Sequence, residues 1–370
     1  MTSRTPYPHV SAARVRANIA RMQEIAAHAG VRLRPHAKTH KSPRIARMQI
    51  EAGAVGICCA KLSEAEVFAD HGITDIRLPY PISPTNADRV MALQDRLQLS
   101  LIVDDEDVAK DWSAIMTAAK RRLDVLVKVD VGTHRCGVDP TADDIVDRIG
   151  RIAGLPGLSF RGLLSHAGHA YEAGSPYELA AITEQERDIM TGLAKGLRES
   201  GVDVEEISVG STPTAAFAPS QRGITEMRPG NYVFLDRTQV GLGSGRIDQC
   251  ALFVVASVVS RPAPDRAILD CGSKTLTSDG ARGFVKAPGF GLVFLSATDD
   301  TPEASIVIER LSEEHAICRI PSELPLRPGD RVRVLPNHAC TVTNLTDALV
   351  FVEEDGATER VPVAARGRIW

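Results

Sequence analysis

The stretch LSLIVDDEDVAKDWSAIMTAAKRRLDVLVKVDVG, residues 99–132, contains a strand, a helix and a second strand in immediate succession. The two outer segments are continuous apolar runs, the pattern of strands buried on both faces of a parallel sheet. The middle segment begins in the acidic run at residues 104–107, and carboxylates favour the N-terminal end of a helix. This unit predicts an α/β fold with helical crossovers between parallel strands.

The same unit recurs over the first 245 residues. Ser11 can cap a helix that continues to about Ala29 and ends at Gly30, and Pro43 can begin a second helix after a short strand at residues 31–36. Further strands are predicted at residues 54–60, 75–80, 160–168 and 205–212. Seven or eight repeats favour a closed (β/α)₈ barrel over residues 11–245, because such barrels take about 250 residues.

The remaining residues, 246–370, predict a different architecture. Alternating apolar runs are separated by turn-rich spacers such as PAPDR and LPLRPGD, and no helical periodicity is evident. We therefore expect a second domain, an antiparallel β-domain, to which residues 1–10 are also assigned.

Composition excludes several classes of protein. A formal net charge of −4 provides no basic surface for nucleic acid. No apolar run approaches the roughly 18 residues that span a bilayer, and the first residues resemble no signal peptide, so we expect a cytoplasmic protein with no membrane partner. Seven scattered cysteines predict no disulfide framework, and Cys58 and Cys59, inside an apolar strand, are expected in the core.

Polar side chains follow the predicted barrel strands, where barrel enzymes carry their active sites. In RPHAKTHK, residues 34–41, Lys38 lies among histidines and other cations directly after a strand. An isolated lysine is usually a solvated surface residue. At a strand end in a semi-enclosed site, however, neighbouring cations and desolvation favour an amine nucleophile that can form an imine with a carbonyl group.

Two late turns add a candidate anion site. SVGSTPTA and RPGNYV offer hydroxyls and backbone N–H groups where phosphate sites often form in barrels, although either turn alone is more often only a turn. A lysine combined with a phosphate cradle is what pyridoxal 5′-phosphate requires.

Seven motifs then occur in an order that resembles a known family: RPHAKTHKS, VDVGTHRCGV, SHAGHAY, SVGSTPT, PGNYVFLD, SEEHA and LPNHACT. The chain is similar over its whole length to the fold-type III pyridoxal-phosphate enzymes of the D-serine dehydratase and D-threonine aldolase family. These are relatives of alanine racemase, with an N-terminal barrel and a C-terminal β-domain.

The resemblance implies roles for individual residues. Lys38 resembles the Schiff-base lysine, and Arg135 the arginine beside the cofactor's phenolic oxygen. His166 and Tyr171 resemble residues beside the pyridine ring. The phosphate cradle is implied to comprise Gly210, Ser211, Thr212, Gly230, Asn231 and Tyr232. His338 and Cys340 resemble the metal-binding pair.

Residue chemistry also supports the metal pair. Residues i and i+2 of an extended segment face the same way, so His338 and Cys340 can present an imidazole and a thiolate to one ion, a donor set that suits zinc. Manganese and magnesium are alternatives. Without the surrounding motifs, a hydrogen-bonded loop histidine and a buried thiol would be the preferred interpretation. His315 is a weaker candidate for supporting the metal site.

The family contains enzymes with two outcomes on D-3-hydroxy amino acids. We expect D-serine dehydratase-like β-elimination to a 2-oxo acid and ammonia, because the aldolase branch carries Asp where Cys340 stands. The alternative is D-threonine aldolase-like or D-3-hydroxyaspartate aldolase-like cleavage to glycine and an aldehyde. The resemblance also implies a homodimer.

Two other classes are less well supported. A pyridoxal-phosphate carrier would need no metal pair. A racemase commonly needs a second acid/base group, a tyrosine of the C-terminal domain, and no tyrosine occurs beyond residue 245.

Overall fold

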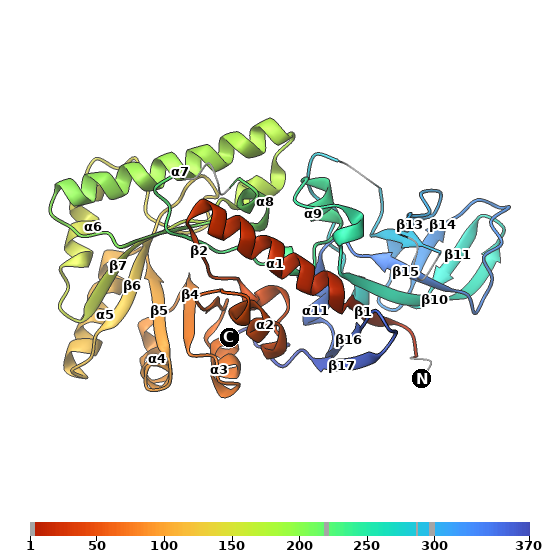
Figure 1. Ribbon diagram of the computed structural model, residues 1–370, viewed down its shortest axis with the longest axis horizontal. Coiled ribbons are helices and arrows are strands. Elements are labelled where there is room, and N and C mark those ends of the chain that lie inside the picture. Colours follow the sequence, from red (N-terminus) through yellow and green to blue (C-terminus); the bar gives the residue numbers. More distant parts are fainter. Residues whose placement is uncertain (1–3, 218–221, 286–287, 296–299) are drawn as a thin grey trace.

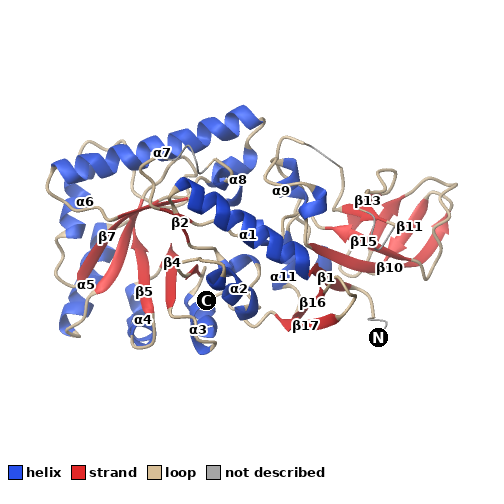
Figure 2. Ribbon diagram, viewed as in Figure 1, coloured by secondary structure: helices blue, strands red, loops and turns tan. Residues whose placement is uncertain are grey.

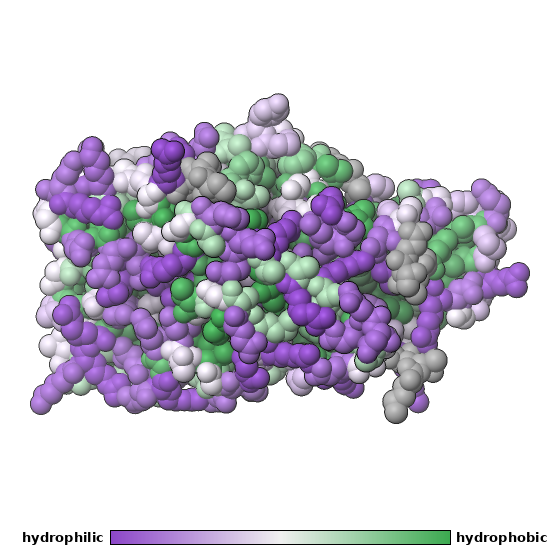
Figure 3. All heavy atoms as spheres, in the orientation of Figure 1, coloured by the Kyte–Doolittle hydropathy of each residue, from purple (hydrophilic) through white to green (hydrophobic). Residues whose placement is uncertain are grey.

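The computed structural model describes residues 4–217, 222–285, 288–295 and 300–370. It contains two bodies side by side: a sheet of eight strands surrounded by helices, and a second sheet of nine strands (Figures 1 and 2). Hydrophilic side chains predominate on the face in Figure 3, with apolar residues scattered between them. Within the described ranges, no helix combines the length and the apolar character needed to cross a membrane.

The eight-stranded sheet is parallel and has the order β2-β9-β8-β7-β6-β5-β4-β3. Its strands are β2 (Arg32–Leu33), β3 (Ile57–Cys58), β4 (Asp75–Pro81), β5 (Gln98–Val103), β6 (Leu123–Lys128), β7 (Leu158–Leu164), β8 (Glu206–Val209) and β9 (Glu226–Met227). Backbone hydrogen bonds from Cys58 N to Pro35 O (2.8 Å) and from Val55 N to Leu33 O (2.9 Å) also join β2 to β3. The sheet therefore closes, and the predicted (β/α)₈ barrel is confirmed.

Helices connect these strands on the outside of the barrel. They are α2 (Pro43–Glu51), α3 (Leu62–Asp70), α4 (Ala87–Gln94), α5 (Glu106–Ala118), α6 (Ile145–Ala153), α7 (Pro176–Glu199) and α8 (Thr212–Ala215). The helix α1 (Ala12–Ala29) precedes β2, and α9 (Arg237–Gly241) follows β9 and lies next to the second sheet (Figure 1). The predicted caps are present: Ser11 Oγ accepts from Arg14 N (3.4 Å), and Gly30 has a φ of 66°. Asp105 caps α5, so the acidic run does begin a helix.

The second sheet runs in the order β13-β14-β11-β10-β1-β16-β17, and β15 pairs with both β10 and β12. Its strands are β1 (Tyr7–Ser11), β10 (Leu252–Ala263), β11 (Arg266–Leu269), β12 (Leu292–Phe294), β13 (Val307–Leu311), β14 (Ala316–Arg319), β15 (Arg331–Leu335), β16 (Ala348–Val352) and β17 (Thr358–Pro362). β1 comes from the start of the chain and pairs with β10.

Two expectations for this domain were wrong in detail. The sheet is mixed, because β1 is parallel to β16 while the other pairs are antiparallel. A hairpin can produce only antiparallel neighbours, whereas β1 and β16 are separated in sequence by the whole barrel. The domain also contains two short helices, α10 (Ser273–Leu276) and α11 (Ala339–Asn344).

Buried ion pairs fill the barrel interior below the ends of the strands. Arg77 pairs with Glu206 (2.8 Å) and with Glu226, and Arg34 also pairs with Glu226 (2.8 Å). Burial opposes ionisation of Glu226, but the two guanidinium groups dominate and lower its pKa to about 2. The network also holds Ser208, whose Oγ donates a hydrogen bond to Glu226 (2.6 Å).

Candidate active site

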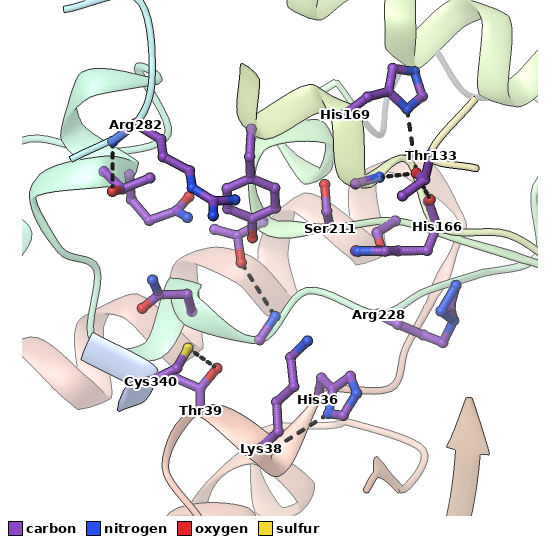
Figure 4. Close-up of a pocket in the computed structure, with 18 of the residues that line it drawn as sticks. His36, Lys38, Thr39, Thr133, His166, His169, Ser211, Arg228, Arg282 and Cys340 are labelled. Carbon is purple, nitrogen blue, oxygen red and sulfur yellow. Dashed lines mark hydrogen bonds between the residues drawn. The ribbon is translucent and has the colours of Figure 1, made fainter. Parts of the chain in front are cut away.

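A cavity of about 530 Å³ lies at the carboxyl ends of the barrel strands, where the barrel meets the β-domain. Figure 4 shows side chains from both domains pointing into it. The cavity wall contains eleven of the twelve site residues predicted from the sequence: Lys38, Arg135, His166, Tyr171, Gly210, Ser211, Thr212, Gly230, Asn231, His338 and Cys340. Segments more than 300 positions apart in the chain thus meet at one place.

Lys38 lies in η1 (Ala37–Thr39), a single turn of 3₁₀-helix after β2. His36 begins the turn, and its Nδ1 accepts a hydrogen bond from Lys38 N (3.4 Å). The Lys38 side chain extends from this turn into the cavity (Figure 4). Its backbone is therefore held while its amine is available to a ligand.

Two histidines flank this lysine. Burial first, and then the positive charge of Lys38, hold the pKa of His36 and of His166 well below its ordinary value. His166 follows β7, and its Nδ1 lies 3.3 Å from the carbonyl oxygen of Gly210. Both rings are neutral at pH 7, so they can contact a bound ring without adding charge.

The two late turns that were predicted to form a phosphate cradle lie beside the lysine turn. Gly230 N donates to Thr212 Oγ1 (3.3 Å), which joins the two turns. A Cβ at Gly230 would lie 2.9 Å from Thr39 Oγ1 and 3.0 Å from His36 O, so only glycine permits this approach to the lysine turn. Oδ1 of Asn231 is buried on this wall and has no hydrogen-bond partner among the described residues.

Tyr232 is the one predicted residue that does not line the cavity. Its ring is fully buried, and its hydroxyl accepts from Gln49 Nε2 (2.9 Å). Consecutive residues of a 3₁₀ turn such as η5 (Asn231–Val233) point about 120° apart, so Tyr232 faces away when Asn231 faces the cavity. Its side chain therefore packs the barrel instead of contacting a ligand in the cavity.

Tyr171 and Arg135 also line the cavity. Tyr171 belongs to η3 (Gly168–Glu172), and burial, followed by the negative charges of Cys340 and Asp236, raises the pKa of its hydroxyl. That hydroxyl stays protonated and can donate a hydrogen bond. Arg135 is exposed in the loop after β6 and lines the cavity at its rim.

His338 and Cys340 are adjacent, but the extended segment expected for them is wrong. His338 is the N-cap of α11 with extended backbone, and Cys340 is the second residue of that helix. Ala339 N donates to the buried carboxylate of Asp236 (2.8 Å), which anchors the start of α11 on the barrel. Thr39 Oγ1 lies 3.2 Å from Cys340 Sγ, so the pair is in direct contact with the lysine turn.

The imidazole of His338 has a second partner. Its Nδ1 is 2.6 Å from Oδ2 of Asp279, a residue of the loop after α10. Burial lowers the pKa of His338, but the hydrogen bonds and charges of Cys340 and the nearby carboxylates outweigh it and raise the pKa to about 10. Across the described ranges, no cluster of three or more His, Cys, Asp or Glu has metal-binding geometry, so the candidate metal site rests on two donors.

The sequence reasoning missed several cavity residues. Arg228, in the MRPG segment, is buried on the wall; its Nε donates to Ser208 Oγ (2.9 Å) and its NH2 group to Ser165 O. Lys128, the last residue of β6, is also buried there, and burial together with Arg228 lowers its pKa to about 7. Both lie at the carboxyl end of a barrel strand, which is the position that made Lys38 a candidate, so the sequence carried the same signal for them.

The weaker candidates lie elsewhere. His315 is exposed between β13 and β14 and does not line the cavity. Cys58 and Cys59 are fully buried, as expected, and burial raises the pKa of both thiols.

Comparison with known proteins finds similarity over both domains. Residues 10–238 match the family model "Alanine racemase, N-terminal domain", and residues 251–352 match "Putative serine dehydratase domain". The chain is 34% identical to the D-threo-3-hydroxyaspartate dehydratase of Delftia sp. (strain HT23), over 97% of each chain. It is 35% identical to a D-threonine aldolase of Arthrobacter sp., over 98% of this chain and 93% of that one.

A similar structure has been solved in a metal-free form. It is a D-threo-3-hydroxyaspartate dehydratase variant with one cysteine replaced by alanine, in the metal-free form. It superimposes with a TM-score of 0.92 at 33% identity, covering 100% of this chain and 99% of that one.

Proposed function

Because the chain belongs to the family that joins an alanine racemase N-terminal domain to a serine dehydratase domain, we propose that it is a pyridoxal-phosphate- and metal-dependent lyase. The substrate is a D-3-hydroxy amino acid, and the reaction is β-elimination to a 2-oxo acid and ammonia. The observation that supports the proposal is the contact between the lysine turn and Cys340, because it brings the candidate amine and a candidate metal donor into one cavity.

The residues of the cavity suit both pyridoxal phosphate and a divalent metal ion. Gly230 leaves room that a Cβ would fill, and the unpartnered Oδ1 of Asn231 lies on the same wall. Lys38 would hold pyridoxal phosphate at its aldehyde end, with Ser211 and Thr212 at its phosphate end. His338 and Cys340 would hold a divalent ion, because imidazole nitrogen and thiolate sulfur are preferred zinc donors.

Pyridoxal phosphate supplies an electron sink for the bond to Cα, and the ion supplies a Lewis acid for the substrate hydroxyl. The protein provides the remaining functions. The Lys38 amine would take the proton from Cα of the substrate. The neutral His36 and His166 rings and the protonated Tyr171 hydroxyl line the same cavity. Arg228 keeps a positive charge at the buried end of the cavity.

Retro-aldol cleavage to glycine and an aldehyde is the second candidate, because the Arthrobacter aldolase is as similar to the chain as the Delftia dehydratase. We place elimination first because a thiol stands at position 340 and the metal-free dehydratase variant has lost a cysteine. Zinc as the ion, a homodimer and a cytoplasmic location remain predictions.

The products distinguish the two reactions. The holoenzyme should be incubated with D-threo-3-hydroxyaspartate, D-serine and D-threonine, and 2-oxo acid, ammonia and glycine should be measured separately. Equal amounts of 2-oxo acid and ammonia without glycine are expected. Glycine as the main product would move the assignment to the aldolases, and no product from any of the three would reject the lyase.

Asp279 should matter for metal affinity. If Nε2 of His338 ligates the ion, the Asp279 carboxylate accepts a hydrogen bond from Nδ1–H and fixes the orientation of the imidazole ring. Asp279→Asn should therefore weaken metal binding about 10- to 100-fold, measured by competition with a chelator. The cofactor's visible absorption should not change. Asp265→Asn, an exposed site in the same domain, is the matched control, and equal affinities in the two variants would reject this role.

A further inference from the structure

Arg282 is a cation of the cavity wall that the functions above do not use. It comes from the β-domain loop after α10, and its side chain reaches towards the middle of the cavity (Figure 4). In the described part of the chain, its guanidinium makes no ion pair and no side-chain hydrogen bond. An arginine held on the wall of a binding cavity without a partner is prepared for an anionic ligand.

The backbone of this loop is fixed, although the guanidinium is free. Arg282 N donates to Thr238 Oγ1 (3.2 Å), and Val285 N donates to Gly241 O (3.2 Å). Gly283 has a φ of 102°, and a Cβ there would lie 2.8 Å from the Gly241 backbone. The loop is therefore packed against α9 at Arg282 and directly after it, which restricts where the guanidinium can reach.

The same contacts tie Arg282 to the metal pair. Thr238 Oγ1, which accepts from Arg282 N, donates to Asn337 O (2.8 Å), directly before His338. Asn337 Nδ2 donates in turn to Asp279 O (3.0 Å). Arg282 and His338 therefore belong to one hydrogen-bonded part of the cavity wall.

We propose that Arg282 is a specificity-determining residue that binds a carboxylate on Cβ of the substrate, which makes this enzyme selective for D-3-hydroxy dicarboxylic amino acids. The inference rests on the proposed function, because it places the substrate hydroxyl at His338 and Cys340. The hydroxyl is carried by Cβ, so the second substituent of Cβ lies on the same wall. D-Serine and D-threonine would leave the guanidinium without a partner.

The kinetic test compares three substrates in matched holoenzymes. Arg282→Gln should lower kcat/KM for D-threo-3-hydroxyaspartate by about 10- to 100-fold, the effect of losing hydrogen bonds to a charged group. The values for D-serine and D-threonine should stay within about threefold, since neither offers a second carboxylate. Arg282→Lys should lose less than Arg282→Gln, because lysine keeps the positive charge but lacks the planar guanidinium that binds a carboxylate through two hydrogen bonds. Arg266→Gln, an exposed arginine on β11, is the control.

Equal losses on all three substrates would overturn the proposal, because they would place Arg282 on a group common to all of them, such as the α-carboxylate. An unchanged selectivity would overturn it as well. Cofactor absorption and melting temperature of each variant exclude a folding defect as the cause.

A binding measurement separates this inference from the lyase assignment. D-Aspartate and D-alanine lack the hydroxyl and differ in the β-carboxylate, and their binding can be followed by the cofactor's visible absorption. The wild-type holoenzyme should bind D-aspartate more tightly, and Arg282→Gln should remove the difference. That result would support the inference even if no lyase product formed, whereas equal affinities in the wild type would overturn it.

Discussion

Lys38→Ala is expected to abolish turnover and the visible absorption of the bound cofactor together. Lys38 is the lysine whose side chain leaves the strand-end turn and enters the cavity beside the phosphate cradle. Its amine would both hold the cofactor and move the Cα proton, so kcat should fall by at least about 10⁴-fold. Absorption spectra and product formation of the purified variant, reconstituted with excess pyridoxal phosphate, provide the measurement.

Lys128 is the comparison that makes this result decisive. It lines the same cavity, and its pKa of about 7 gives it a substantial fraction of neutral amine at physiological pH. Lys128→Met should keep the cofactor's visible absorption, because the Lys38 turn is intact. If Lys38→Ala kept the absorption and Lys128→Met lost it, the cofactor anchor would be Lys128.

Cys340→Ala is expected to remove the metal and elimination activity while leaving the cofactor bound. The thiol would supply one of two protein donors, so its loss leaves His338 alone to hold the ion. Lewis-acid assistance is worth several kcal/mol, so activity should fall on the order of 10³-fold. The cofactor's proposed anchors are on the barrel, so its absorption should persist. Metal content by atomic spectroscopy and product assays are the measurements.

Cys136→Ala is the matched control, since Cys136 and Cys340 are the two cysteines that are not fully enclosed. It should bind metal and turn over as the wild type does. Prolonged chelation of the wild type should reproduce the Cys340→Ala phenotype, and added zinc should reverse the effect of chelation. Full activity in demonstrably metal-free protein would reject a role for the ion and leave the cofactor assignment standing.

Local sequence determined the barrel and most of the site. Continuous apolar runs with capped helices between them admit few arrangements other than a parallel barrel, and parallel strands bring their carboxyl ends to one edge. Lys38, His166 and Gly210 were therefore predictable as neighbours, because each lies shortly after the end of a strand. Lys128, the last residue of β6, and Arg228, the first residue after β9, lie at the same edge of the barrel and were predictable in the same way.

Only the tertiary structure decided which side chains face the cavity and what the β-domain contributes. The direction of Tyr232 depends on one 3₁₀ turn and on its hydrogen bond with Gln49, which sequence spacing does not reveal. Asp279 and Arg282 lie in a loop without regular pattern, and hydrogen bonds to residues far away in the chain hold that loop at the site. Sequence periodicity records the local conformation that each segment prefers, whereas contacts of this kind depend on long-range packing between two domains.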